Sequence, residues 1–256
     1  MIKTHRISFL MIGGFVLFWL LFALFRIESG TQSRFESIQN RGVIRLCGEA
    51  PEPFELHRRL GEAFAERHHL KLVYITVEDA KQARRQLQSG ACDILVSPLP
   101  MHAQKNTRIT YTQPIYKSRL YLVQKRAGVK DPLHLEQCTL TLTKHSPYAL
   151  NIRHLSEEID RSIHIRYAAH MKRVNILDGV QSGRYDFSVV DEPQIPYFQA
   201  LYPELDFNTA ISFDQLHAWG IPSENSALLD SVNVFLDEMK KSPAYARLLN
   251  DYGLKP

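Results

Sequence analysis

One short pattern occurs twice in the chain. An amphipathic run ends at Gln88-Ser89-Gly90 and another at Gln181-Ser182-Gly183, and in both copies an aspartate and a mostly apolar run follow shortly afterwards. Glycine adopts the left-handed conformation that closes a helix, and a short apolar run suits a parallel strand that is covered on both faces. The repeat therefore predicts two similar α/β lobes, each with a helix that leads into a buried strand.

The ends of these two strands indicate where a ligand would bind. Ligands of open parallel sheets lie beyond the carboxyl ends of the strands. Ser97 and Asp191 come directly after the two apolar runs, so we expect both to face a shared cleft between the lobes.

Size and charge exclude several other classes. The 256 residues are 45% hydrophobic and 23% charged, which suits two lobes of roughly 100 residues each. The net charge of +4 comes from 31 basic and 27 acidic residues spread through the chain, without the basic stripe of a nucleic-acid binder. No His/Cys spacing matches a zinc site. We therefore expect no nucleic acid, no metal and no cofactor.

The N-terminus predicts a membrane anchor. Residues 7–25 carry no charge and are long enough to span a bilayer. Basic residues precede them, which places the rest of the chain on the outer side. A cleaved signal peptide is the alternative, although the bulky Phe25 does not suit a cleavage site. We assign residues 1–30 to the anchor with its flanks, and residues 31–40 to a polar, flexible spacer.

The three cysteines are expected to be buried free thiols. Cys47 ends one predicted strand and Cys92 begins a parallel neighbour, so about four residues of strand rise would separate them, beyond the reach of a disulfide. Cys138 would lie in the other lobe.

The remaining patterns predict an alternation of strands and helices, joined by right-handed crossovers. Lobe 1 comprises residues 41–125 and 218–256, and lobe 2 comprises residues 126–217. Strands are expected at 42–47, 72–75, 93–97, 120–123, 139–143, 163–167 and 187–190, and helices at 55–68, 78–88, 146–159, 174–180, 194–201, 228–239 and 244–249. Two crossings between the lobes, near 124–129 and 212–221, would form a hinge.

Several motifs resemble a known family. The strand at 42–46, the block from Leu87 to Ser97, and the Tyr-Thr-Gln-Pro-Ile-Tyr block at 111–116 resemble the amino-acid-type (family 3) bacterial extracytoplasmic solute-binding proteins over about residues 41–252. Second-lobe pieces and the ending at 246–253 look closest to the non-catalytic N-terminal module of the membrane-bound lytic transglycosylase F group. The resemblance implies a two-lobed, periplasmic-binding-protein-like (type II) α/β fold with a hinge, here preceded by one N-terminal transmembrane helix.

The resemblance also implies a ligand-binding set. Its members are Phe54, Ser97, Lys105, Tyr111, Ser146 and Asp191. Asp191 matches the acidic residue that holds a ligand's amino group, and Lys105 stands where the family has an arginine for the ligand's carboxylate. A lysine offers charge without the planar, two-pronged fork of arginine.

Each of these residues also has a purely structural reading. Asp191 and Ser146 suit helix caps, although the free N–H groups behind Ser146 would also hold an anion. Phe54 and Tyr111 would otherwise belong to the core, and Lys105 would be a solvated charge.

The expected function is that of a membrane-anchored, extracytoplasmic, non-catalytic solute-binding protein. It would recognise a small polar ligand, such as an amino acid, peptide or cell-wall fragment, for uptake or sensing. The N-terminal helix would cross the bacterial inner membrane once, with the soluble part in the periplasm. If the N-terminal segment is cleaved, the protein would instead be secreted to the periplasm. An ABC importer or the cell-wall machinery is the expected partner.

Two alternatives stay open. Because the chain stops at Pro256, we expect no transglycosylase domain, but dehydratases share this fold and would need a protonatable group over the cleft. The candidates for that group are Asp191, His102, His145 and Lys105. The other alternative is a degenerate scaffold that acts through protein contacts, suggested by Lys105 and by a shortened first loop.

Overall fold

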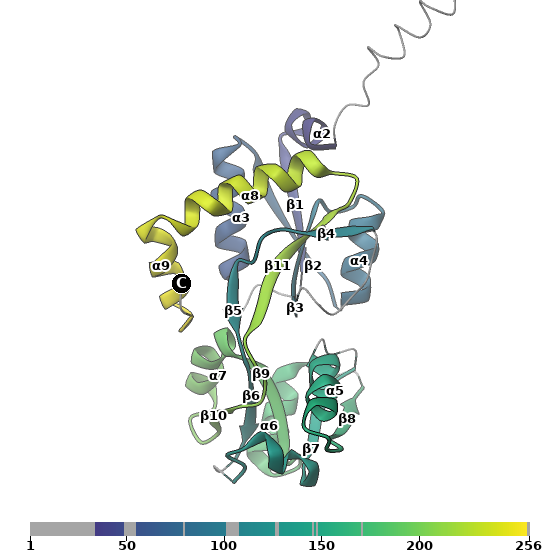
Figure 1. Cartoon of the computed structure of the whole chain (residues 1–256), viewed down its shortest axis with the longest axis vertical. Helices are drawn as coiled ribbons and strands as arrows, with labels where there is room; N and C mark the ends of the chain where they lie inside the picture. Colours follow the sequence, from purple (N-terminus) through teal and green to yellow (C-terminus); the bar gives the residue numbers. More distant parts are fainter. Residues whose placement is uncertain are drawn as a thin grey trace, which may run out of the picture.

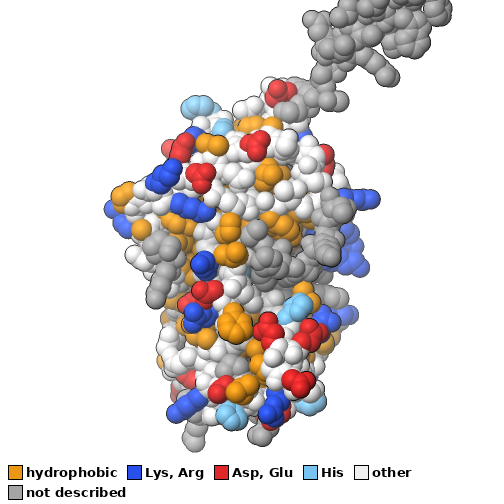
Figure 2. All heavy atoms as spheres, in the orientation of Figure 1, with side chains coloured by type: hydrophobic (Ala, Val, Ile, Leu, Met, Phe, Trp, Pro, Cys, Tyr) orange, Lys and Arg blue, Asp and Glu red, His pale blue; other side chains and the backbone are white. Residues whose placement is uncertain are grey.

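The computed structural model forms two lobes stacked along its long axis (Figure 1). It describes residues 34–48, 55–78, 80–100, 108–125, 128–144, 146, 148–169 and 171–254. The predicted anchor, Phe54 and Lys105 lie outside these residues. Within the described ranges, no helix combines the length and apolar character needed to cross a membrane. Basic and acidic side chains are interspersed over both lobes on the face shown in Figure 2.

Lobe 1 is a mixed sheet covered by helices. Its strand order is β2-β1-β3-β11-β4, with β5 paired to β11. The strands are β1 (Val43–Gly48), β2 (Lys71–Thr76), β3 (Ile94–Pro100), β4 (Ile109–Tyr111), β5 (Tyr116–Ser118) and β11 (Gln215–Pro222). The helices are α2 (Arg34–Arg41), α3 (Leu56–Arg67), α4 (Ala80–Gln88), α8 (Ser226–Lys240) and α9 (Pro243–Asn250).

Lobe 2 has its own five-stranded sheet, in the order β10-β6-β9-β7-β8. The strands are β6 (Leu120–Gln124), β7 (Thr139–Thr143), β8 (His164–Ala168), β9 (Phe187–Asp191) and β10 (Asp206–Ala210). The helices are α5 (Tyr148–Glu158), α6 (Arg173–Ser182) and α7 (Ile195–Leu201), with short 3-10 turns η1 (Pro132–Gln137) and η2 (Glu192–Gln194). The two sheets are separate, as the sequence predicted.

The repeated pattern has the predicted structure in both lobes. Gly90 and Gly183 have positive φ angles of 74° and 80°, which suits glycine after a helix. β3 runs parallel to β1, and β9 runs parallel to β7. The copies differ at the aspartate that follows. Asp93 is buried and forms ion pairs with Arg41 and Arg45. Its counterpart in lobe 2, Asp186, is exposed.

The first crossing between the lobes lies earlier in the chain than residues 124–129. β6 pairs with β9 and β10 and so belongs to the sheet of lobe 2. The chain therefore crosses between β5 and β6, at residues 118–120, and returns between β10 and β11, at residues 211–215. The apolar residues of β6 complete the core of lobe 2. If lobe 2 began only after residue 125, β9 and β10 would lack the strand that joins them.

The predicted spacer contains a helix. α2 occupies residues 34–41, and its Phe35 and Ile38 are buried in the core of lobe 1. Two apolar residues three positions apart lie on one helix face, and here that face packs near α8. The expectation of a flexible spacer over residues 31–40 was therefore wrong for residues 34–40. Two apolar residues in a polar segment are too few to give a recognisable helical pattern in the sequence.

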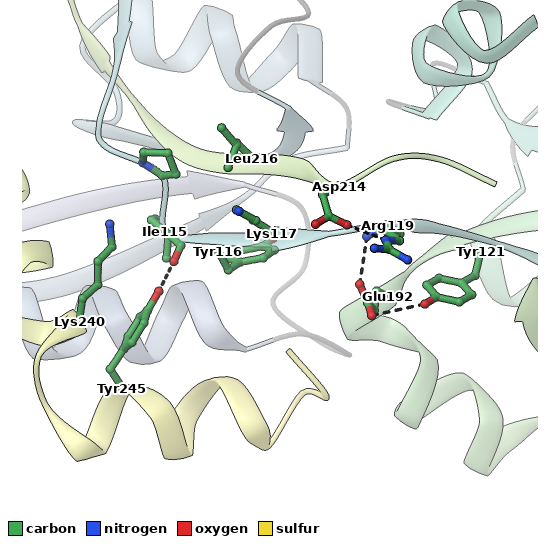
Figure 3. A pocket seen from close by; sticks show the side chains of 11 residues that line it. Ile115, Tyr116, Lys117, Arg119, Tyr121, Glu192, Asp214, Leu216, Lys240 and Tyr245 are labelled. Carbon is green, nitrogen blue, oxygen red and sulfur yellow. Dashed lines mark hydrogen bonds and ion pairs between the residues drawn. The ribbon is translucent and has the colours of Figure 1, made fainter. Parts of the chain in front are cut away.

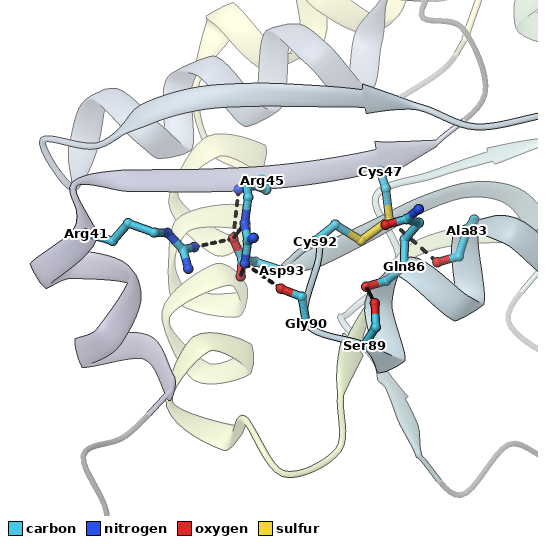
Figure 4. The surroundings of a disulfide bond; sticks show 9 residues. All are labelled: Arg41, Arg45, Cys47, Ala83, Gln86, Ser89, Gly90, Cys92 and Asp93. Carbon is cyan, nitrogen blue, oxygen red and sulfur yellow. Dashed lines mark hydrogen bonds and ion pairs between the residues drawn. A yellow bond between two sulfur atoms is a disulfide. The ribbon is translucent and has the colours of Figure 1, made fainter.

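The expectation of three free thiols was also wrong. Cys47 and Cys92 form a disulfide with their Cα atoms 5.9 Å apart (Figure 4). Cys92 does not extend β3 backwards as assumed. Its N–H bonds to Gln86 O in the turn after α4, so the chain folds back over the end of β1. Within the described part, Cys138 is the free, buried thiol.

Candidate ligand site at the lobe junction

Asp191 lies at the junction of the two lobes. It ends β9 with a side chain that is almost completely buried. Its Oδ1 atom accepts hydrogen bonds from Ser118 Oγ at 2.5 Å and from the Glu192 N–H at 3.1 Å. Ser118 is the last residue of β5 in lobe 1. Its hydrogen bond therefore connects a carboxylate of lobe 2 to a strand of lobe 1.

His217 joins the same group from β11. Its Nε2 atom lies 2.8 Å from Ser118 Oγ, and its ring stacks on Tyr116 with centroids 4.5 Å apart. His217 also pairs in the sheet with Pro100, at the carboxyl end of β3. The ends of β3 and β9 therefore meet at the junction. Ser97 lies within β3, three positions before that end.

The hydrogen bonds restrict where the protons lie. A serine hydroxyl has one proton, so if Ser118 donates to Asp191 it cannot also donate to His217. His217 must then carry its own proton on Nε2 and donate it to Ser118. This tautomer leaves Nδ1 as an acceptor, and Nδ1 is buried without a hydrogen-bond partner among the described residues.

Burial dominates the electrostatics of the junction. It raises the pKa of Asp191 to about 7, against the opposing effects of the Ser118 and Glu192 hydrogen bonds and of the Arg173 charge. Burial also lowers the pKa of His217 to about 4. At neutral pH the histidine is therefore neutral and the carboxyl group is close to half ionised. A cation brought next to Asp191 would favour its ionised form.

Ser146 precedes α5 on the lobe 2 side. The Tyr148 N–H donates to Ser146 Oγ at 3.3 Å, which matches the structural reading of Ser146 as a helix cap. Asp191 likewise caps η2 through the Glu192 N–H. Both residues are buried.

A second polar group links the helices of lobe 2 near Asp191. Gln194 Oε1 accepts from Arg173 Nη1 at 2.7 Å and from the Tyr148 hydroxyl at 3.3 Å. The Arg173 guanidinium lies over the Tyr148 ring, 5.2 Å from its centroid. These contacts connect α5, α6 and η2, so they hold the lobe 2 side of the junction together.

Tyr111 lies elsewhere in lobe 1. It is half-buried in β4 and packs against the cluster that contains Cys47, Leu87 and Leu95. Burial raises the pKa of its hydroxyl. Phe54 and Lys105 fall outside the described residues. The structure therefore places Asp191 and Ser146 on the lobe 2 side, Ser97 on the strand that leads to the junction, and Tyr111 in a core cluster.

Sequence reasoning missed Ser118, His217, Arg173 and Gln194. One signal was present: His217 is a polar residue in the mostly apolar run from Leu216 to Ile221, and a polar residue in a buried strand needs a partner. Among the described residues, no group of three or more His, Cys, Asp or Glu side chains is placed to hold a metal ion.

The comparisons with known proteins agree with this architecture. Residues 49–255 match the family model of bacterial extracellular solute-binding proteins, family 3. The chain is 25% identical to membrane-bound lytic murein transglycosylase F of Vibrio parahaemolyticus, over 91% of this chain and 50% of that protein. Its identity to the Erwinia tasmaniensis protein of that name is 23%, over 98% and 53%. The chain thus spans about half the length of these relatives.

Solved structures show the same fold. An amino acid transporter's substrate-binding protein from Streptococcus pneumoniae, bound to L-arginine, has a TM-score of 0.71 at 17% identity, over 85% of this chain and 97% of that one. An ancestral amino-acid-binding protein, described as a precursor of cyclohexadienyl dehydratase, has a TM-score of 0.71 at 20% identity, over 86% and 99%. At these identities the likeness concerns the fold.

Proposed function

Since the chain belongs to the bacterial extracellular solute-binding proteins of family 3, we propose that it captures a small, amine-bearing polar solute between its lobes without transforming it. The observation that carries this proposal is the place of Asp191. A buried carboxylate ends a strand of lobe 2 and is hydrogen-bonded to the hinge strand of lobe 1.

The state of Asp191 favours a cationic ligand group. It forms no direct salt bridge with any described residue, and burial raises its pKa to about 7. A ligand ammonium would supply an opposite charge in direct contact with the carboxylate and form charge-assisted hydrogen bonds. Amino acids, peptides and amine-bearing cell-wall fragments all carry such a group.

The other proposed contacts would bind the rest of the ligand. Ser146 stands before α5, and the positive end of the helix dipole there favours an anion such as a carboxylate. Ser97 and Lys105 would contribute from lobe 1, and Phe54 and Tyr111 would line the cleft. These assignments follow from the family resemblance.

We also propose an extracytoplasmic location with an anchor in residues 1–30. The Cys47–Cys92 disulfide supports it, because disulfides persist in oxidising compartments. The curated relatives are named membrane-bound. From there the protein would deliver its ligand to an ABC importer or report it to the cell-wall machinery.

A ligand screen with two matched variants tests the proposal. The full chain is screened by thermal shift against amino acids, muropeptides and the corresponding desamino acids, since a ligand raises apparent stability by mass action. We expect a shift with an amine-bearing compound and none with its desamino analogue. Asp191→Asn should weaken that ligand about tenfold or more, which corresponds to about 1.4 kcal/mol. Asp186→Asn, at the exposed position just before the same strand, should leave the affinity unchanged.

Equal affinity in the wild type and Asp191→Asn would contradict the assignment of Asp191. A chain that shifts with none of the compounds would favour the scaffold reading.

A dehydratase is the second candidate function. It is favoured by the solved neighbour described as a precursor of cyclohexadienyl dehydratase and by a buried carboxyl group that changes its protonation near neutral pH. Turnover of prephenate or arogenate that disappears in Asp191→Asn would support it. Absence of turnover by the wild type would exclude it for these substrates.

A further inference from the structure

A pocket of about 680 Å³ lies beside the hinge, between α9 of lobe 1 and η2 of lobe 2 (Figure 3). Lys117, Leu216, Lys240 and Tyr245 line it from lobe 1, and Tyr121 and Glu192 line it from lobe 2. This volume falls in the range of small-molecule sites. The pocket is therefore large enough for an organic ligand and has walls from both lobes.

The pocket is distinct from the junction around Asp191 but adjoins it. Ser118, Asp191 and His217 do not line the pocket, whereas their sequence neighbours do. Lys117 and Arg119 flank Ser118, Glu192 follows Asp191, and Leu216 precedes His217. The same short segments thus contribute side chains to the buried junction and to the pocket, and Tyr116, which stacks on His217, lines the pocket as well.

The acidic groups of the pocket already have partners. Arg119 Nε donates to Asp214 Oδ1 at 2.6 Å. The Glu192 carboxylate accepts from the Arg119 N–H at 3.1 Å and from the Tyr121 hydroxyl at 3.4 Å. Neither carboxylate therefore requires a cationic ligand.

Two lysines remain without a carboxylate in direct contact. Lys117 is exposed and has no hydrogen-bond or ion-pair partner among the described residues. Lys240 is half-buried and donates one bond, to Gln113 Oε1 at 2.9 Å. With the Arg119–Asp214 pair and Glu192 counted, these lysines leave the pocket with one net positive charge. An incoming anion would be attracted.

The rest of the wall is apolar. The Tyr245 hydroxyl is bonded to Ile115 O, so the polar end of this residue is satisfied and its ring is left for contact. Pro114 and Leu216 also line the pocket. We propose that this hinge pocket is a second ligand site, which binds a small organic anion that consists of a carboxylate on an aromatic or aliphatic body. The inference does not depend on which ligand occupies the cleft at Asp191.

Benzoate is a suitable probe for this site. Its binding to the full chain is followed by NMR chemical-shift titration, with benzamide as the neutral analogue and sodium chloride at equal ionic strength as the reference, because salt screens exposed charges. We expect saturable binding with shifts centred on residues 114–121, 214–216 and 240–245, and at least fivefold weaker binding of benzamide.

Lysine variants complete the test. Lys117→Gln and Lys240→Gln should each weaken benzoate binding at least threefold. Lys241→Gln, which removes an exposed charge from the next position outside the pocket lining, should not change it. The proposal is overturned if benzoate does not bind saturably, if benzamide binds equally well, if the shifts centre on other residues, or if both lysine variants bind like the wild type.

Discussion

Three buried ionisable side chains near the junction act in opposite directions on stability. Burial, and then the charge of His217, lower the pKa of His57 to about 3, and burial lowers that of His217 to about 4. Between these pKa values and the ordinary histidine value of about 6.5, the two histidines bind protons in the unfolded chain but not in the folded protein. Both residues therefore make stability rise with pH. Burial raises the pKa of Asp191 from 3.8 to about 7. Between these values its carboxyl group is protonated only in the folded state, so it makes stability fall as the pH rises.

The net effect predicts a rise in stability between about pH 4 and 6.5. Two protons against one leave one net proton, which corresponds to about 1.4 kcal/mol per pH unit. Asp191→Asn should about double this slope, because it removes the opposing contribution, and His217→Gln should flatten it. Urea unfolding at several pH values measures the slopes. If both variants keep the wild-type slope, the buried groups do not titrate as described.

The imidazole of His217 gives a second test at the scale of single residues. If Ser118 donates to Asp191, His217 is protonated at Nε2 and bare at Nδ1. Imidazole ¹⁵N chemical shifts at neutral pH should show this tautomer, and Ser118→Ala should change the shift of Nε2 most. The opposite tautomer would mean that Ser118 donates to His217.

These residues also show what sequence reasoning reaches. The place of Asp191 at the end of a buried strand was predictable, because that relation is local. Ser118 and His217 were not, because their contact joins residues about 100 positions apart, through the path of two crossings. Only the folded arrangement of β5 and β11 brings them together.

At the scale of elements, two buried helical glycines give a matched pair. A Cβ at Gly179 in α6 would meet the ring of Tyr185, whereas one at Gly61 in α3 would meet the end of the Leu46 side chain. Both alanine variants gain about 1 kcal/mol of helix propensity. Overpacking costs about 1–3 kcal/mol, and a ring yields less than a leucine tip.

We therefore expect Gly179→Ala to lose more stability than Gly61→Ala. Chemical unfolding of both variants measures the difference. A more stable Gly179→Ala would mean that Tyr185 can move aside.

The disulfide gives the second prediction for elements. Cys47 and Cys92 are 45 residues apart in the sequence, and closing such a loop stabilises the folded state by about 4 kcal/mol in the chain-entropy account. The double variant Cys47→Ala/Cys92→Ala should lose stability of this order in urea. Dithiothreitol should destabilise the wild type and leave the double variant unaffected. A wild type that is insensitive to the reductant would contradict the disulfide.

Most strands and helices were predictable because their apolar periodicity is local and strong. The strands β4, β5, β10 and β11 were not predicted. Their partner strands lie far away in the sequence. The other exceptions have one cause. α2, the fold-back at Cys92 and the place of β6 each depend on a contact with another element: α8, the end of β1, and β9 with β10. The local sequence of a short polar segment or of a strand does not identify the element that it contacts.

For the whole molecule, the repeat was enough to predict two separate sheets. It did not show how the lobes touch. Among the described side chains, few polar contacts join the lobes: Asp191 bonds to Ser118, and Asn151 bonds to Gln215 at 2.9 Å. The Arg119–Asp214 pair joins the two crossing segments to each other. A small set of polar contacts makes rotation of one lobe against the other inexpensive in free energy.

Such a hinge predicts a ligand-dependent change in overall dimensions. A ligand that contacts both lobes binds the closed arrangement more tightly, so it shifts the population toward that arrangement in proportion to the difference in affinity. Small-angle X-ray scattering should therefore show a smaller radius of gyration when the amine-bearing ligand from the screen saturates the protein. Asp191→Asn weakens binding without removing the hinge, so it should need a higher ligand concentration and reach the same final radius. An unchanged radius at saturation would mean that the lobes hold a fixed angle and that the ligand enters a preformed cleft.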